Sequence, residues 1–165
     1  MTHQALLKPH DLAADEINGW RGRCLDLFAR GERTIDLALE TALTGAPGLA
    51  MKHLAGHRLA DLAKLVSEEK TATEKQKQSL QSSLDSWLAS NTKRAFLAHG
   101  VTTVLLDRHG DWHAQFDFVR YQGKQRQAER WSCSKHEAWD YELLLERSLI
   151  LLSSQLGHFL KRICA

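Results

Sequence analysis

Apolar residues recur along this chain at two different periods, and the change between the two constrains the fold more than any other feature. Before Gly100 and again after residue 134, apolar side chains recur every three or four residues, which is the spacing of an amphipathic helix. Between Val101 and Cys133, β-branched and aromatic residues alternate with polar ones, which indicates antiparallel strands. The sequence therefore predicts a mainly α fold, a four-to-five-helix bundle with a three-stranded antiparallel β-meander inserted before the last helix.

The first two expected helices are separated by strong turn chemistry. Gly45-Ala46-Pro47-Gly48 lies between a helix of about residues 11–43 and a second helix of about residues 49–69. Gly31 falls within the first helix, where a glycine either kinks the helix or allows a neighbouring element to approach closely.

Capping sequences mark the starts of the remaining helices. In a capping box, a Ser or Thr and a Glu or Gln three residues later each accept a hydrogen bond from the other's backbone N–H. Two such boxes precede the third helix and one precedes the last, of about residues 135–163: Thr71-x-x-Glu74, Thr73-x-x-Gln76 and Ser134-x-x-Glu137. We expect the third helix to reach His99 and to end at Gly100 in the left-handed conformation.

The last helix is apolar almost all round. A helix with this pattern is either central to the core or shared with a partner subunit. No repeat or composition shift divides the chain, so we predict a single domain of residues 1–165 with the β-meander at about residues 101–133.

Positive charge is concentrated around the predicted meander. The whole chain has a formal net charge of +2, whereas residues 91–136 contain eight Lys or Arg and four Asp or Glu, which gives +4 there and −2 elsewhere. A basic region of this kind suits an anionic ligand. The alternative is an ordinary solvated surface of mixed charge.

The cysteines and the hydropathy pattern point to the cytoplasm. Cys24, Cys133 and Cys164 are odd in number and far apart, which is typical of free thiols in a reducing compartment. No apolar run approaches the ~18 residues of a membrane span, and the N-terminal residues lack the pattern of a signal peptide. We expect a cytoplasmic protein without a membrane partner.

Arg94 and His99 are the main catalytic candidates. Both lie near the end of the third expected helix, within the basic region. Arginine is a permanent cation that matches phosphate geometry, and histidine transfers protons near neutral pH. Asn91 and Lys93, just before Arg94, are weaker candidates for substrate binding. The alternative is that Arg94 and His99 only interact with carbonyl groups at the helix end.

Other histidines and the tryptophans have simpler interpretations. His53 and His57 have the spacing of two metal ligands, but the sequence offers no third, so we expect neither a metal site nor a cofactor. The tryptophans are expected in the core; only Trp112 and Trp131, on the meander, are candidates for stacking on RNA bases.

The chain resembles the HEPN family of nucleotide-binding helical domains, many of which are ribonucleases in toxin–antitoxin and phage-defence systems. The resemblance rests on Arg94-x4-His99 with Gly100 after it, and on one more long helix following the motif. Ala95 replaces the polar residue that often follows the family's Arg. Val101 replaces the Tyr that one subclass uses as a site of nucleotidylation. We therefore do not expect the activity to be silenced by modification at that position.

The resemblance implies a homodimer whose two Arg/His motifs face each other across a cleft. Such a dimer would be a metal-independent endoribonuclease of toxin or defence type that leaves 2′,3′-cyclic phosphate ends. His99 would act as general base or general acid, and Arg94 would hold the scissile phosphate. RNA would be the substrate, and an antitoxin or regulatory protein a further partner. The alternative, which Ala95 favours, is a non-catalytic HEPN-like module that binds nucleotides or a protein. A third is a helical interaction domain unrelated to this family, in which the last helix drives association.

Overall fold

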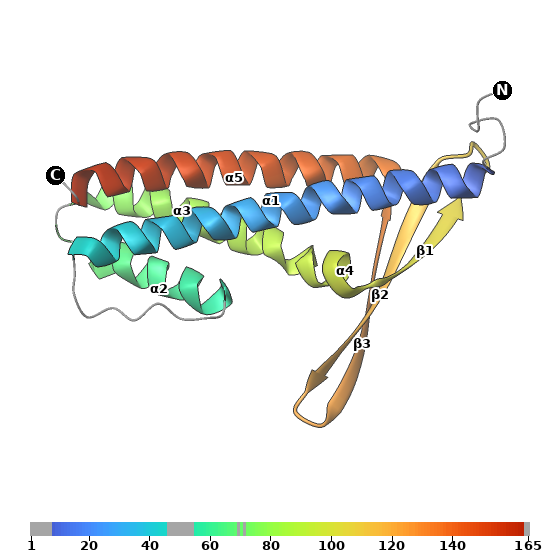
Figure 1. The fold of residues 1–165 in the computed structure, drawn as a ribbon, viewed down its shortest axis with the longest axis horizontal. Helices are drawn as coiled ribbons and strands as arrows, with labels where there is room; N and C mark the ends of the chain where they lie inside the picture. Colours follow the sequence, from blue (N-terminus) through green and yellow to red (C-terminus); the bar gives the residue numbers. More distant parts are fainter. Residues whose placement is uncertain (1–7, 46–54, 69, 71, 164–165) are drawn as a thin grey trace. The chain divides into compact units, whose positions relative to one another are not determined.

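The fold is mainly α, with a three-stranded antiparallel sheet inserted before the last helix, as the sequence predicts. The computed structural model describes residues 8–45, 55–68, 70 and 72–163 (Figure 1). Its elements in chain order are α1 (Pro9–Gly45), α2 (Ala55–Glu68), α3 (Glu74–Ser90), a 3₁₀ turn (Asn91–Lys93), α4 (Arg94–His99), β1 (Val101–Leu106), β2 (Trp112–Gln122), β3 (Gln125–Ser134) and α5 (Lys135–Ile163).

The chain divides into two compact units, and α1 and α5 each contribute to both. The first unit contains the chain up to Asp26 together with Thr92–Leu144, and therefore the whole sheet and α4. The second unit contains Leu27–Asn91 and the chain from Leu145 onward. No helix in the described part of the chain has the length and hydropathy needed to cross a membrane.

Trp20 of α1 is the centre of the first unit. Its side chain is fully buried, and its ring centroid lies 6.1–6.2 Å from those of Trp112, Phe116 and Trp131 on the sheet. Its indole Nε1–H donates to the Ala138 carbonyl of α5 at 2.8 Å, so the polar atom of this apolar side chain is also satisfied. One tryptophan therefore joins α1, the sheet and the first turn of α5.

Arg21, next to Trp20, fixes the end of α4. Its Nε and Nη2 donate to the Leu97 carbonyl at 3.1 and 2.7 Å, and its Nη1 donates to Thr102 Oγ1 of β1 at 2.6 Å. The guanidinium also lies over the Phe116 ring, 5.5 Å from its centroid. Arg21 thus satisfies a carbonyl that the helix end leaves unpaired, and holds α4 against β1.

In the second unit, Gly31 allows α1 to lie directly against α3. A Cβ atom at this position would overlap the ring of Trp87, which is buried and also meets Phe28 edge-on at 5.8 Å. Because α1 runs unbroken through Gly31, the structure supports the close approach of a neighbour rather than a split helix. Arg58 of α2 pairs with Asp36 of α1 at 2.7 Å in the same unit.

Both helix starts predicted from capping sequences are present. Glu137 Oε2 accepts hydrogen bonds from the N–H and hydroxyl of Ser134 at 2.8 Å, and the Glu137 N–H donates to Ser134 Oγ at 3.3 Å. At α3 the box is that of Thr73, whose N–H donates to Gln76 Oε1 at 3.1 Å. Thr71, the alternative, lies outside the described residues, as does most of the turn at 45–48.

The third helix differs from its prediction in two ways. It ends at Ser90, and a 3₁₀ turn separates it from α4, so Arg94 begins a new helix. Ser90 Oγ donates to the Ser86 carbonyl at 3.0 Å, and such bonds from serine to the preceding turn weaken and bend helices. Gly100 is extended, with φ −69° and ψ 137°, and not left-handed. A glycine is needed there because a Cβ would overlap the Phe96 carbonyl oxygen and lie 3.2 Å from Phe116 Cβ.

Candidate nucleic-acid interface at α4 and the β2–β3 ribbon

An aromatic cluster, formed by Phe96, Phe118 and Trp131, joins α4 to the sheet. Phe96 is buried on the inner side of α4, and its ring meets Phe118 of β2 and Trp131 of β3 edge-on at 5.8 and 6.1 Å. The far face of the Trp131 ring is stacked on Phe116 at 5.3 Å. The cluster fixes α4 relative to the two longest strands.

His99 lies at the exposed edge of this cluster. It ends α4, its side chain is exposed, and its imidazole stacks on Phe118 with a centroid distance of 6.3 Å and an interplanar angle of 28°. The ring is therefore held by an aromatic neighbour while the residue remains exposed to solvent. His99 keeps the position at a helix end that the sequence predicts.

Lys93 adds a cation to the same cluster. Its Nζ lies 5.5 Å from the Trp131 centroid and 5.8 Å from the Phe96 centroid, within the range of a cation–π interaction. Trp131, a predicted stacking residue, is half-buried, and its ring also contacts Trp20, Phe116 and Tyr141. Trp112, the other predicted stacking residue, is 2% exposed and donates from Nε1 to Glu16, so it belongs to the core.

Arg94 and His99 do not converge on α4. They are the first and last residues of this six-residue helix, so they lie about 140° apart around its axis and about 7.5 Å apart along it. Arg94 is half-buried, whereas His99 is exposed. Asn91 belongs to the second unit, and the structure does not place it with Lys93 or His99. Of the predicted site residues, Lys93 and His99 therefore share one cluster.

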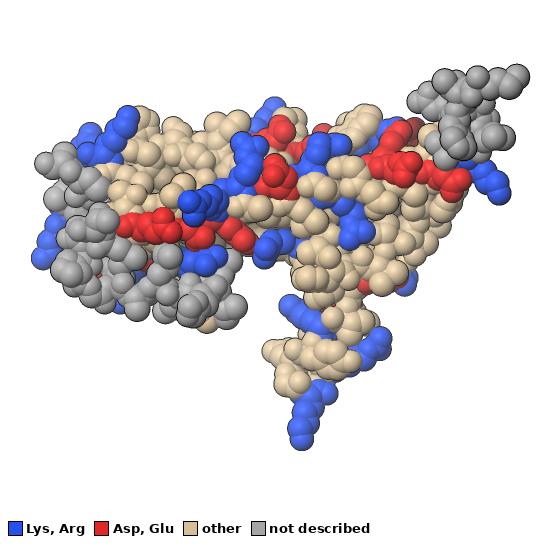
Figure 2. Space-filling view, viewed as in Figure 1, with Lys and Arg blue, Asp and Glu red and all other residues tan. Residues whose placement is uncertain are grey.

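Beyond this cluster, β2 and β3 continue as a two-stranded ribbon. The β1–β2 pairing ends at Val101↔Asp117, while β2 and β3 remain paired from Phe118↔Glu129 to Gln122↔Gln125 (Figure 1). We call residues 118–130 the ribbon. It has four cations and one anion, and Figure 2 shows Lys and Arg side chains along it and at its tip. The cations are Arg120, Lys124, Arg126 and Arg130.

Ion pairs and amide hydrogen bonds hold the ribbon together. Arg120 pairs with Glu129 at 2.6 Å across the strands, and its Nε donates to Gln127 Oε1 at 3.3 Å. Gln127 Nε2 in turn donates to Gln122 Oε1 at 3.0 Å. We call the end of the ribbon next to β1 its root. There Arg130 pairs with Asp117 at 2.6 Å, and this hydrogen bond lowers the pKa of the Asp117 carboxyl. Half of the ribbon's cations are thus already neutralised by neighbours.

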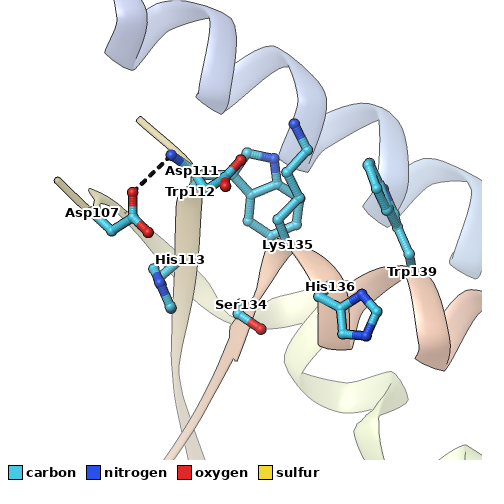
Figure 3. A pocket seen from close by; sticks show the side chains of 8 residues that line it. All are labelled: Asp107, Asp111, Trp112, His113, Ser134, Lys135, His136 and Trp139. Atoms are coloured by element: carbon cyan, nitrogen blue, oxygen red, sulfur yellow. Dashed lines mark hydrogen bonds between the residues drawn. The ribbon is translucent and has the colours of Figure 1, made fainter. Parts of the chain in front are cut away.

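A separate pocket of about 510 Å³ lies at the other end of β2 (Figure 3). Asp107 and His113 lie on one side of it, and Lys135 and Trp139 of α5 lie on the other. Asp107 Oδ1 accepts from the backbone N–H groups of His109 and Asp111 at 2.7 and 3.0 Å, which lowers the pKa of Asp107 and holds the β1–β2 turn. These groups maintain local structure. Five residues of β2, or about 17 Å, separate His113 of this pocket from Phe118.

The other predicted histidine and cysteine features form no site among the described residues. Among the described residues, no group of three or more His, Cys, Asp or Glu side chains is arranged to hold a metal ion. His57 is exposed at the start of α2, and His53 lies outside the described residues. Cys24 and Cys133 are buried, and burial, with a smaller effect of Glu137, raises the pKa of the Cys133 thiol to about 12, so this thiol is unreactive. Cys164 lies beyond the described residues.

No family model, curated protein or solved structure matches this chain. Phe96 and Phe118 carry the site but were not singled out in the sequence. The alternation of Ala114, Phe116 and Phe118 indicated that Phe118 shares the buried face of β2, but its contact with His99 depends on how α4 packs, which no local pattern shows.

Proposed function

We propose that the surface formed by α4 and the ribbon binds RNA, and that His99 cleaves it without a metal ion. The observation that carries the proposal is the position of His99: exposed, stacked on Phe118, and at the root of a basic ribbon. Lys93, which lies over the half-buried Trp131 ring, adds a cation beside the aromatic cluster. Aromatic groups beside cations are the combination that proteins use to bind unpaired nucleic acid.

The chemistry needs only groups of this kind, because RNA carries its own nucleophile. His99 removes the proton from a ribose 2′-OH as the oxygen attacks the adjacent phosphorus. The P–O5′ bond breaks, and a protonated imidazole supplies the proton to the leaving 5′-oxygen. The products are a 2′,3′-cyclic phosphate and a 5′-hydroxyl. One imidazole cannot perform both transfers at once, so the proposal includes a second His99 from a partner copy of the chain.

A homodimer also accounts for the separation of Arg94 from His99. Arg94 and His99 of one α4 point in different directions, so they do not meet at one phosphate. The Arg94 that stabilises the phosphate is therefore assigned to the partner copy. We extend the proposal to a cytoplasmic role in a toxin or defence system, with an antitoxin or regulatory protein as a further partner.

A second candidate is a binding module that does not cut RNA. The half-buried position of Arg94 and the apolar Ala95 beside it favour this alternative. Such a module would bind RNA at the same surface of α4 and the ribbon, and would differ only in lacking the cleavage step.

Cleavage of RNA in EDTA separates the two candidates. The purified chain is incubated with mixed single-stranded RNA, and the same experiment is done with His99→Ala and, as a matched control, His109→Ala, which removes an exposed histidine from the β1–β2 turn. We expect His99→Ala to lose about 10²-fold or more of the rate, the usual contribution of a general acid–base group, and His109→Ala to retain it. Binding without cleavage by the parent supports the second candidate. Equal rates for the parent and His99→Ala exclude His99 as the catalyst.

A further inference from the structure

We infer that the tip of the ribbon, Tyr121 with Lys124 and Arg126, is a second RNA contact that holds the backbone of a single strand leading away from His99. This inference rests on the proposed function and gives its substrate class: unpaired RNA extending more than about four nucleotides from the cleaved bond.

The two cations of the tip differ from those nearer the root. Arg120 and Arg130 are paired with Glu129 and Asp117, whereas Lys124 and Arg126 are exposed and make no ion pair with another described residue. An unpaired surface cation is available to replace the counterions of a phosphate, which is the main source of affinity for nucleic acid. The tip is therefore the part of the ribbon most suited to bind a polyanion.

Tyr121 gives the tip an aromatic surface. Its side chain is 70% exposed, although tyrosine is usually at least partly covered. Tyr121 and Arg126 are directly opposite each other in the β2–β3 register, so their side chains lie on the same face of the ribbon. A ring and a cation on one face provide a stacking surface for a base and a contact for its phosphate.

The ribbon holds this tip at a set distance from His99. Four residues of β2 separate Phe118, on which His99 stacks, from Gln122 at the turn, which is about 13 Å at about 3.3 Å per residue. The chain of contacts from Glu129 through Arg120 and Gln127 to Gln122 stiffens this span. With about 3.4 Å of rise per stacked nucleotide, the span corresponds to about four nucleotides.

Two features favour a single strand over a duplex. At the root, the exposed His99 ring is stacked on the half-buried Phe118 ring, and only unpaired bases can stack on such rings. Attack by a 2′-OH also requires the sugar and phosphate to rotate into line, which a regular helix restricts. We therefore assign an unpaired strand whose bases stack at the root and whose phosphates reach the tip.

The test compares two lengths of RNA. Binding of 2′-fluoro oligouridines of 4 and 12 nucleotides, which cannot be cleaved by 2′-OH attack, is measured by fluorescence anisotropy at several salt concentrations. The proteins are the full-length parent, the double variant Lys124→Ala/Arg126→Ala, and a control that removes two other exposed cations, Lys75→Ala/Arg108→Ala.

We expect the tip variant to bind the 4-mer like the parent and to bind the 12-mer on the order of tenfold more weakly at low salt. Its slope of log K against log salt for the 12-mer should be shallower by about 1.4, because each of the two cations that neutralises a phosphate of a single strand contributes about 0.7 to the slope. The control should match the parent in both measurements.

Three results overturn the inference. Equal slopes for the parent and the tip variant exclude the tip contact, while metal-free cleavage by His99 would still stand. Tighter binding of a 12-base-pair RNA duplex than of the 12-mer, lost in the tip variant, excludes the single-strand assignment. Absence of RNA binding by the parent excludes both this inference and the proposed function.

Discussion

Gly31 sets how closely α1 approaches α3. Replacing its hydrogen with a methyl group forces the carbon into the ring of Trp87, which is 1% exposed and has little room to move. We expect Gly31→Ala to lower the free energy of unfolding by about 1–3 kcal/mol, the usual cost of overpacking. Urea unfolding monitored by tryptophan fluorescence measures this change.

The matched control is Gly22→Ala, on the same helix. In the described part of the chain, no atom outside the helix lies within 4 Å of where its Cβ would be. Alanine is the better helix former, so this variant should be more stable by roughly 0.5–1 kcal/mol. Equal effects of the two substitutions would contradict the packing assigned to Gly31.

Glu16 links the stability of the first unit to pH. It accepts hydrogen bonds from Lys135 and Trp112, each at 2.9 Å, and these two bonds lower the pKa of its carboxyl. The ionised form is thus favoured by folding, so its contribution is present above the ordinary glutamate pKa near 4.5 and is lost as pH falls through the lowered value. Glu16→Gln should be less stable at pH 7, by at most about 1 kcal/mol because solvent screens the half-exposed Glu16 carboxylate.

The difference between the parent and Glu16→Gln should therefore shrink as pH falls below about 4.5. Thermal unfolding of both proteins between pH 3 and pH 7 measures it. A difference that stays constant over this range contradicts the assigned ionic contacts.

At the scale of elements, the start of α5 depends on Ser134. Its hydroxyl accepts a hydrogen bond from the Glu137 N–H, and without it that donor loses its partner at the helix end. We expect Ser134→Ala to cost about 1 kcal/mol of stability, as measured by thermal or urea unfolding. Ser132→Ala, an exposed serine two residues earlier in β3, should have little effect.

Sequence patterns predicted the elements better than the site. The capping boxes, the change of period at Gly100 and the alternation along β2 are local signals, and the corresponding helices and strands are present. The break at Ser90 was missed because the apolar spacing continues across it into α4. The stacking of His99 on Phe118 depends on Arg21, 78 positions earlier, which holds the end of α4.

At the scale of the whole molecule, the proposal requires two copies of the chain. The described part of α5 leaves large apolar side chains exposed in each unit, Trp139, Leu143 and Leu144 in the first and Ile150 and Leu151 in the second. We expect light scattering at micromolar concentration to give about twice the 18.7 kDa mass of the chain. A monomer that still cleaves RNA would contradict the paired site.

The most direct test of the central claim is the nature of the RNA ends formed in EDTA. We expect mass spectrometry of the products to show 2′,3′-cyclic phosphate and 5′-hydroxyl ends with the parent and with His109→Ala, and about 10²-fold less product with His99→Ala. Products with 5′-phosphate ends, or undiminished cleavage by His99→Ala, would contradict the account.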